Sequence, residues 1–271
     1  MDLGRVKTYL IIILAVGNAL LGGLFGFRFF SEAAAQRQSD EQLVALLAER
    51  GVFVRELPSE TAAALVLSRD FAAEGSAAAA LLGEAQMADL GGGAVEYQNG
   101  AGYALFRSGG RFNIDIRPER GAVYTDLEKA CREMLADMGF LNVSEGFLEE
   151  FDSDGGVLLT FGQDVERRHL YNARAVFHFS DGGELLSVSG LWALGAVNDD
   201  DGAQCKSAGA ALLLFAVNHD AEVLRVELGY RLGTQTATAE SARLGPEWRV
   251  VCADGEFYLD GFTGAVVERE E

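Results

Sequence analysis

The chain has 271 residues, with 22 Lys and Arg against 41 Asp and Glu, which gives a formal net charge of −19. A surface this acidic repels phosphate groups, so the composition argues against nucleic acid as a partner. Hydrophobic residues make up 49% of the chain and only three prolines occur, which predicts a folded body with a substantial core and excludes a disordered stalk.

The first element in chain order is an uncharged apolar run of 19 residues, at positions 9–27. A helix of that length covers about 29 Å, close to the thickness of the hydrocarbon core of a bilayer. Arg5 and Lys7 precede the run, and a short basic head favours a cytoplasmic N-terminus. We therefore predict a single-pass protein of the cell membrane, with a cytoplasmic tip at residues 1–8, an anchor at residues 9–30 and an extracytoplasmic C-terminal domain.

A cleaved signal peptide is the alternative to an anchor, because Ala33, Ala34 and Ala35 offer small residues for a cleavage site. The apolar run exceeds the roughly 7–15 residues of a typical signal-peptide core, which favours the anchor. Asn18 lies in the middle of the run, where an unpaired amide is costly. It is either a tolerated single polar residue or a contact with another membrane helix, and the sequence leaves both interpretations open.

Residues 31–122 are expected to form a membrane-proximal α+β region. Ser39 begins a capping-box pattern that predicts a helix of about three turns, and Gly51 supplies its C-terminal stop. Asn99 and Gly100 lie between two alternating segments and predict a hairpin turn. Further elements are expected as an alanine-rich helix over residues 76–90 and as strands over residues 52–57, 63–69, 95–97, 103–106 and 112–116.

Residues 123–198 and residues 199–271 are each expected to form a unit in which one helix backs antiparallel strands. The first helix follows a capping box at Thr125 and Glu128. The second helix is the apolar run at residues 208–217, which is too short to span a bilayer. Strands are expected over residues 143–151, 157–161, 171–179, 185–192, 224–230, 248–252, 256–259 and 265–267. The predicted fold is therefore α+β, with an N-terminal transmembrane helix followed by two related units of antiparallel sheet, each backed by a helix.

A search for catalytic and metal-binding motifs finds none. His169, His178 and His219 are the only histidines, and none has a second ligand at the spacing of a known metal motif. Phosphate-binding glycine loops and nucleophile elbows are also missing from the sequence. We therefore predict a non-enzymatic protein without catalytic, cofactor or metal sites.

Two acidic segments need interpretation. Asp152, Ser153 and Asp154 resemble the start of a calcium loop, but Val157 and Gln163 stand where such a loop needs glycine and glutamate. This segment is interpreted as a turn, with weak cation binding as the alternative. The charge run at residues 198–201 is interpreted as a solvated loop in a polar break at residues 199–202.

Three cysteines are too few for the disulfide framework of a small exported domain. Cys131 falls on the apolar stripe of a predicted helix, and Cys252 falls inside a predicted apolar strand. Buried free thiols are the favoured interpretation, and a bridge between Cys205 and Cys252 is the alternative.

The sequence resembles the YycI family of regulatory proteins at both of its ends. The N-terminal likeness covers residues 1–8 (MDLGRVKT), the apolar segment that contains Asn18, and residues 43–54 (LVALLAERGVFV). The C-terminal likeness covers residues 228–230 (LGY), 246–250 (PEWRV) and 258–264 (YLDGFTG). The same kind of ending occurs in the related YycH proteins and in PepSY-type domains.

This resemblance implies a non-enzymatic regulator that sits in the membrane of Gram-positive-type bacteria. It implies a sensor histidine kinase of the WalK (YycG) type and a YycH-like protein as partners, contacted through the membrane helix and the ectodomain. The two-component system concerned controls cell-wall metabolism. Under this interpretation Asn18 is a candidate contact between membrane helices, and no cofactor is expected.

Two other functions stay open at this point. The first is a PepSY-like extracytoplasmic module that binds or inhibits a peptidase or a cell-wall enzyme. The second is an exported enzyme with an unfamiliar site, which predicts a deep polar cleft where His169 or His178 meets a carboxylate.

Overall fold

The computed structural model describes residues 39–117, 122–234, 238 and 240–267, without the side chains of residues 201 and 203. The predicted anchor, its cytoplasmic tip, Asn18 and the alanines of the alternative cleavage site lie outside these residues. Among the helices that are described, none combines the length and apolar character that a membrane span requires.

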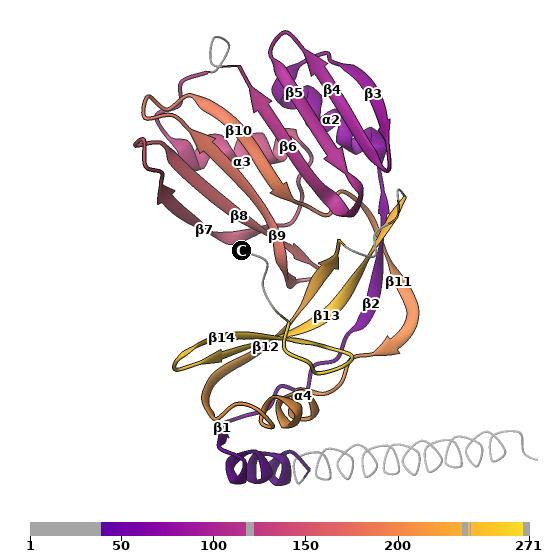
Figure 1. The fold of residues 1–271 in the computed structure, drawn as a ribbon, viewed down its shortest axis with the longest axis vertical. Coiled ribbons are helices and arrows are strands. Elements are labelled where there is room, and N and C mark those ends of the chain that lie inside the picture. The colour runs from indigo at the N-terminus through magenta and orange to yellow at the C-terminus, as the bar shows by residue number, and fades with distance from the viewer. Residues whose placement is uncertain (1–38, 118–121, 235–237, 239, 268–271) are drawn as a thin grey trace, which may run out of the picture.

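The described chain is a mixed α+β protein with two lobes joined at a narrow waist (Figure 1). Its strands form one hydrogen-bonded network of 14 strands, whose main path runs β11-β2-β13-β12-β9-β10-β6-β5-β4-β3. Four strands lie off this path: β1 pairs with β12, β14 pairs with β13, β8 pairs with β9, and β7 pairs with β8. Two separate hydrophobic cores, one in each lobe, lie against this continuous sheet.

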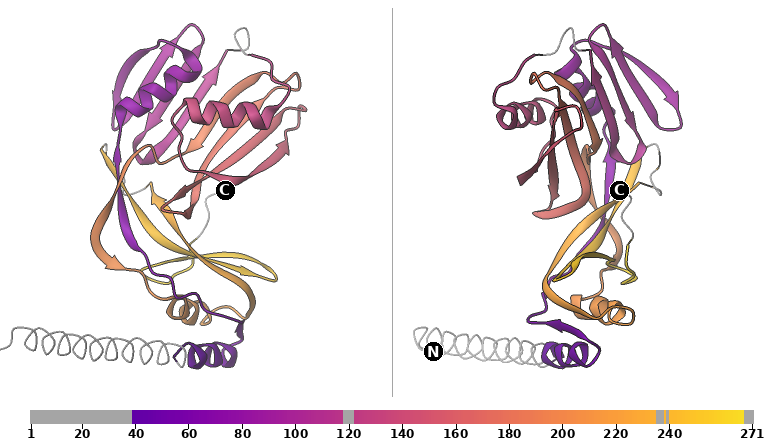
Figure 2. Two further views of the ribbon diagram at one scale, coloured as in Figure 1. Left: turned by 180° about the vertical axis from the view of Figure 1, so that it is seen from behind. Right: turned by 60° about the vertical axis from the view of Figure 1, so that its left-hand side comes forward.

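The described residues of the upper lobe form two α-helices and eight antiparallel strands. The helices are α2 (Phe71–Leu82) and α3 (Leu127–Asp137), and the strands are β3 (Gln86–Gly91), β4 (Ala94–Asn99), β5 (Gly102–Arg107), β6 (Arg111–Ile116), β7 (Val143–Phe151), β8 (Val157–Val165), β9 (Arg168–Phe179) and β10 (Leu185–Leu191). Both helices cover the same face of the sheet (Figure 2, left). The core beneath them is rich in aromatic rings, among them Phe140, which stacks on Trp192 at 5.0 Å.

The lower lobe is built around α4 (Ala208–Phe215) and a more strongly twisted part of the sheet. Its strands are β1 (Val52–Val54), β2 (Ala63–Arg69), β11 (Gly195–Gln204), β12 (Ala221–Gly233), β13 (Ser241–Cys252) and β14 (Gly255–Asp260). Phe215 of α4 and Trp248 of β13 are both fully buried in the core of this lobe. Leu47, from a helical segment over residues 39–49, is buried in the same core, so this segment packs onto the lower lobe.

Side-chain caps explain where the three named helices begin. Asp70 Oδ1 accepts hydrogen bonds from the backbone N–H groups of Ala72 and Ala73 at the start of α2. Asp126 caps α3 and Ser207 caps α4 in the same way. These oxygens satisfy N–H groups that have no partner within the helix. The cap of α3 is therefore Asp126, and the capping box predicted one residue earlier was wrong.

The helix predicted over residues 76–90 was also misplaced. The observed helix starts five residues earlier, at Phe71, because Asp70 caps it, and it ends at Gly83, whose φ is +75°. Residues 86–90, expected to be helical, belong to strand β3 (Gln86–Gly91) instead, and all six residues of this strand are exposed. A strand without a buried face shows no alternation of apolar and polar residues, and this explains why the sequence pattern missed it.

The acidic run at residues 198–201 is part of strand β11, so its interpretation as a solvated loop was wrong. Val197 and Asn198 pair with Leu67 and Val66 of β2, and the register shifts only after Asp199. An acidic strand is tolerated here because β11 is an edge of the sheet, where side chains reach water.

A helix followed by antiparallel strands, predicted for two units, occurs three times in the described residues. Helix α2 precedes β3 to β6, α3 precedes β7 to β10, and α4 precedes β12 to β14. The pairing is not purely antiparallel, because β12 pairs in parallel with β1 and, through Tyr230 and Leu170, with β9. Two helix-and-strand groups therefore share the upper lobe, and the third forms most of the lower lobe.

Gly110 provides a test of how tightly the waist is packed. Its φ is +77°, and a Cβ added there would lie 2.4 Å from the carbonyl oxygen of Trp192. Gly92, in the β3–β4 turn, has a φ of +62° but no atom within 4 Å of such a Cβ, so it is a matched control. We expect Gly92→Ala to cost about 1–2 kcal/mol from backbone strain alone, and Gly110→Ala to cost about 1–3 kcal/mol more, measured by urea unfolding. Equal losses of stability in the two variants would show that the waist around Gly110 shifts to accommodate the added methyl group.

Candidate functional site

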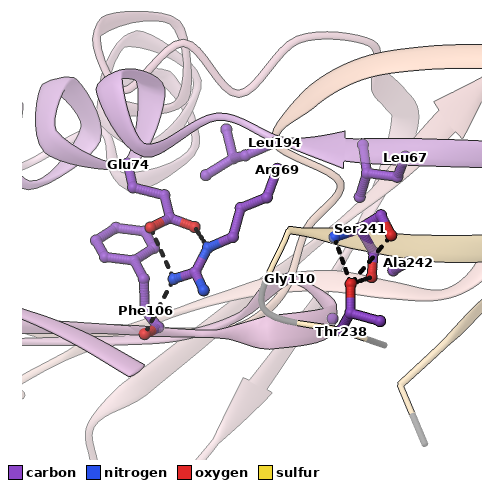
Figure 3. A pocket seen from close by; sticks show the side chains of 10 residues that line it. Leu67, Arg69, Glu74, Phe106, Gly110, Leu194, Thr238, Ser241 and Ala242 are labelled. Carbon is purple, nitrogen blue, oxygen red and sulfur yellow. Dashed lines mark hydrogen bonds and ion pairs between the residues drawn. The ribbon is translucent and has the colours of Figure 1, made fainter. Parts of the chain in front are cut away.

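A small recess in the described structure lies at the waist, between the two lobes (Figure 3). It is lined by the end of β2, the first turn of α2, the β5–β6 connection, the segment before β11 and the start of β13. The lining residues are Leu67, Arg69, Glu74, Phe106, Gly109, Gly110, Leu194, Thr238, Ser241 and Ala242. Its enclosed part is small, on the scale of one ordered water molecule. The recess therefore has no room for a substrate-sized ligand.

A bidentate ion pair dominates this recess. Arg69 Nε lies 2.6 Å from Glu74 Oε1, and Arg69 Nη2 lies 2.9 Å from Glu74 Oε2. Arg69 Nη1 also donates to the carbonyl oxygen of Gly93 at 2.6 Å, and the guanidinium lies 4.5 Å from the centre of the Phe71 ring. The two charged side chains are only 7% and 5% exposed. Arg69 thereby connects the last residue of β2 to α2 and to the β3–β4 turn.

The chemistry of Glu74 follows from its burial. Burial raises the pKa of the Glu74 carboxyl above its ordinary value, and the hydrogen bonds and charge of Arg69 act in the opposite direction. Both carboxylate oxygens accept hydrogen bonds from Arg69, so the pair is occupied by its own contacts. This arrangement serves to hold the two lobes in one geometry. The sequence prediction did not identify it, because the partners of Arg69 come from three separate elements.

His169 and His178 each meet a carboxylate, as the exported-enzyme alternative expected. These contacts lie at the surface of the strands, and not in the deep cleft that this alternative predicts. His169 Nδ1 lies 2.6 Å from Asp164 Oδ1, with the imidazole side chain 56% exposed. Ser144 Oγ donates to the same Asp164 oxygen at 2.8 Å and lies 3.4 Å from His169 Nδ1. In a hydrolase triad the serine and the carboxylate contact opposite nitrogens of the imidazole. Here both approach Nδ1, so this trio lacks the geometry for activating Ser144.

The second histidine closes the acidic turn after β7. His178 Nε2 donates to Asp152 Oδ2 at 2.7 Å, while Asp152 Oδ1 accepts from the backbone N–H groups of Asp154 and Gly156. The hydrogen bond from His178 and the backbone N–H groups lower the pKa of the Asp152 carboxyl. Both Asp152 oxygens are therefore occupied by protein donors. The segment adopts the turn that the sequence suggested, and within the described ranges no group of His, Cys, Asp and Glu is arranged to hold a metal ion.

His219 lies at the end of α4, away from the waist. Its ring stacks on Phe215 at 4.4 Å, and its Nδ1 lies 3.2 Å from the Phe215 carbonyl oxygen. The ring also meets the edge of Phe257 at 5.1 Å. These contacts make His219 part of the packing between α4 and β14.

A polar network covers the outer face of the lower sheet. Arg249 donates to Glu227 at 3.1 Å and also pairs with Glu256, whose Oε2 accepts from the Tyr258 hydroxyl at 3.1 Å. Further along the same β12–β13 pair, Arg231 Nε lies 2.6 Å from the buried Glu247. Opposite charges alternate across β12, β13 and β14 in this network, which is how cross-strand pairs stabilise a sheet.

The three cysteines are buried free thiols, as favoured from the sequence, and Cys205 is not bridged to Cys252. Burial raises the pKa of the Cys131 thiol to about 12 and that of Cys252 to about 11. The sulfur of Cys205 accepts a hydrogen bond from the Ala62 backbone N–H at 3.2 Å. The raised pKa values of Cys131 and Cys252 suppress their reactive thiolate forms, as in structural thiols.

Comparison with protein-family models and with curated proteins finds no match. Among solved structures, an uncharacterized protein from Eubacterium rectale is similar with a TM-score of 0.46 at 10% identity, over 81% of this chain and 89% of that chain. The C-terminal domain of Bacillus megaterium YpeB is similar with a TM-score of 0.41 at 12% identity, over 75% of this chain and 97% of that chain. These scores describe a loose likeness of shape. The resemblance to the YycI family stays a prediction.

The Arg69–Glu74 pair predicts a pH-dependent loss of stability. Arg69→Met removes the interactions that lower the Glu74 pKa, so this pKa rises further above the unfolded value. A carboxyl whose pKa is raised in the folded state costs folding stability as the pH rises through that folded pKa. The stability lost in Arg69→Met should therefore grow with pH. We expect a loss of about 3–5 kcal/mol near neutral pH and a smaller loss in mild acid, measured by urea unfolding.

The matched control is the double variant Arg69→Met/Glu74→Met, which removes the buried charge altogether. It should recover most of the stability and show no pH dependence at this site, because well-packed apolar side chains can replace a buried ion pair. A loss in Arg69→Met that is the same at both pH values would contradict a buried, ionisable Glu74.

Thiol reactivity provides an independent check on the packing. With raised pKa values, Cys131 and Cys252 should react with a thiol reagent at mildly alkaline pH only as fast as the protein opens. Addition of denaturant should make all three thiols react at once. Rapid stoichiometric labelling of the native protein would contradict the burial described above.

Proposed function

We propose that this chain is a non-enzymatic, membrane-anchored regulator of a sensor histidine kinase, with its C-terminal domain outside the cytoplasm. The kinase would be of the WalK (YycG) type that controls cell-wall metabolism, with a YycH-like protein as a second partner. The observation that carries the proposal is the uncharged 19-residue run at positions 9–27. A short polar segment separates this run from the folded ectodomain.

The arrangement of the C-terminal segments supports this proposal. Residues 228–230 on β12 pair with residues 246–248 on β13, and residues 247–250 pair with residues 257–260 on β14. The N-terminal segment at residues 43–54 ends in β1, which pairs with the start of β12. All described segments that resemble the YycI family therefore gather in the lower lobe, which is the lobe that continues from the predicted anchor.

The internal pairing of polar groups also favours a regulatory role over an enzymatic one. The waist ion pair, the two His–Asp contacts and the charged network on the lower sheet are each occupied by their own partners. A catalytic site instead needs polar groups that converge on a space for substrate. We infer that this chain recognises its partners through exposed protein surfaces, and that Asn18 contributes a contact from the anchor.

A PepSY-like module that binds or inhibits a peptidase or cell-wall enzyme is the second candidate function. The specific observation in its favour is the recurrence of one helix followed by antiparallel strands. Under this proposal each group is a related YycH/PepSY-like unit, and the ectodomain alone would carry the partner contact.

Co-purification from gently solubilised native membranes distinguishes the two candidates. The proteins compared are the full-length chain, the full-length chain with Asn18→Leu, and a chain without residues 1–37. If the proposal is correct, a sensor kinase copurifies with the full-length chain, less with Asn18→Leu, and not with the truncated chain, because contact runs through the membrane helix. The opposite result is that a cell-wall hydrolase, and no kinase, copurifies with both the full-length and the truncated chain. This result would contradict the kinase proposal and support the second candidate.

A further inference from the structure

One edge of the upper sheet is open in the described structure. Strand β7 (Val143–Phe151) pairs with β8 along one side only, and it lies at the rim of the lobe in Figure 1. Its residues from Glu145 to Phe151 are all exposed. Arg132 Nη2 donates to the carbonyl oxygen of Glu145 at 3.0 Å, so the start of this edge is partly covered. From Phe147 to Phe151, the backbone groups that point away from β8 are available for pairing with another strand. At nine residues, β7 is also long enough to template one.

Exposed apolar side chains accompany this open edge. Phe147 is 39% exposed, Leu148 is 55% exposed and Phe151 is 73% exposed. Phe147 and Phe151 lie on the face that carries α3, where Phe147 stacks on the buried Phe161 at 5.6 Å. Leu148 points to the opposite face, because side chains alternate along a strand. An added strand could therefore bury apolar surface on both faces.

Two of the usual devices that protect an edge strand, lysine and proline, are missing from β7. Its sequence, VSEGFLEEF, contains neither lysine nor proline, and its only irregularity is a register shift between Val143 and Phe147. The half from Phe147 to Phe151 keeps a regular register with β8, as a strand that accepts a partner requires. Glu149 and Glu150 are the charges on this half, and they point to opposite faces.

These glutamates select the kind of strand that can pair. A second copy of β7 would place glutamates near glutamates, and the chain as a whole carries a net charge of −19, so self-pairing is opposed. A strand with basic side chains opposite Glu149 and Glu150 is favoured instead. Apolar side chains next to these two positions would face Leu148 and Phe151.

We propose that β7 binds an extended segment of a partner protein by β-strand addition, and that this segment has two adjacent basic residues flanked by apolar ones. Backbone hydrogen bonds along residues 147–151 give affinity, and the two glutamates with the apolar side chains give specificity. This surface goes beyond the proposed kinase contact, because it lies on the upper lobe and does not involve the membrane helix.

The proposal is tested with the full-length chain in a nonionic detergent and a fluorescent synthetic peptide that has two adjacent lysines flanked by valines. We expect saturable binding by anisotropy, slower amide hydrogen exchange along β7, and weaker binding at high salt. A peptide with glutamates in place of the lysines, and one with proline at its centre, should fail to bind. Binding of the proline peptide with the same affinity would overturn strand addition.

Charge-reversed variants locate the site. Glu149→Lys/Glu150→Lys should weaken peptide binding more than about tenfold, because it replaces two attractions with repulsions. The control Glu56→Lys/Glu84→Lys makes the same change in net charge at exposed positions away from β7 and should leave the affinity within about twofold. Equal weakening by both variants, or dimerisation of the wild-type chain through β7, would overturn the proposal. None of these outcomes bears on whether a kinase copurifies through the anchor.

Discussion

The arrangement of the two lobes depends on one ion pair buried at the waist. Arg69 is the last residue of the strand that rises from the lower lobe, and Glu74 is in the first turns of the helix that opens the upper lobe. In surroundings of low polarity such a pair is held in one geometry, since either charge alone would be costly to bury. The direction in which the chain leaves β2 is thereby fixed, and with it the position of the sheet that follows.

Much of the upper sheet could be predicted from the sequence, because alternation and turn residues carry that information locally. The strand at residues 143–151 was placed at its observed bounds, and the Asn99–Gly100 hairpin was found. The exposed strand β3 and the acidic strand β11 were missed, since neither has a buried apolar face to create a pattern. Strand identity at those edges is imposed by the neighbouring strand and not by local preference.

The candidate sites were less predictable than the strands. A contact of His169 or His178 with a carboxylate was considered only under the exported-enzyme alternative. Which carboxylate each of these two histidines meets depends on the pairing between β7, β8 and β9. Arg69 and Glu74 are only five residues apart, yet nothing in that spacing distinguishes a buried pair from two solvated charges. Their burial comes from Phe106, Gly93 and Leu194, which only the folded chain brings together.

The route of the chain through the two lobes determines the order in which they can be completed. The upper lobe is one uninterrupted stretch, from α2 at residue 71 to β10 at residue 191. The lower lobe needs both flanks of that stretch, because β2 lies between β11 and β13. Synthesis proceeds from the N-terminus, so all strands of the upper lobe are made before the lower lobe is complete. The lower lobe can close only after the last part of the chain has been synthesised. The lobe that follows the predicted anchor in the sequence is therefore the last to close during synthesis, and its long-range strand pairings make it the slower of the two to fold.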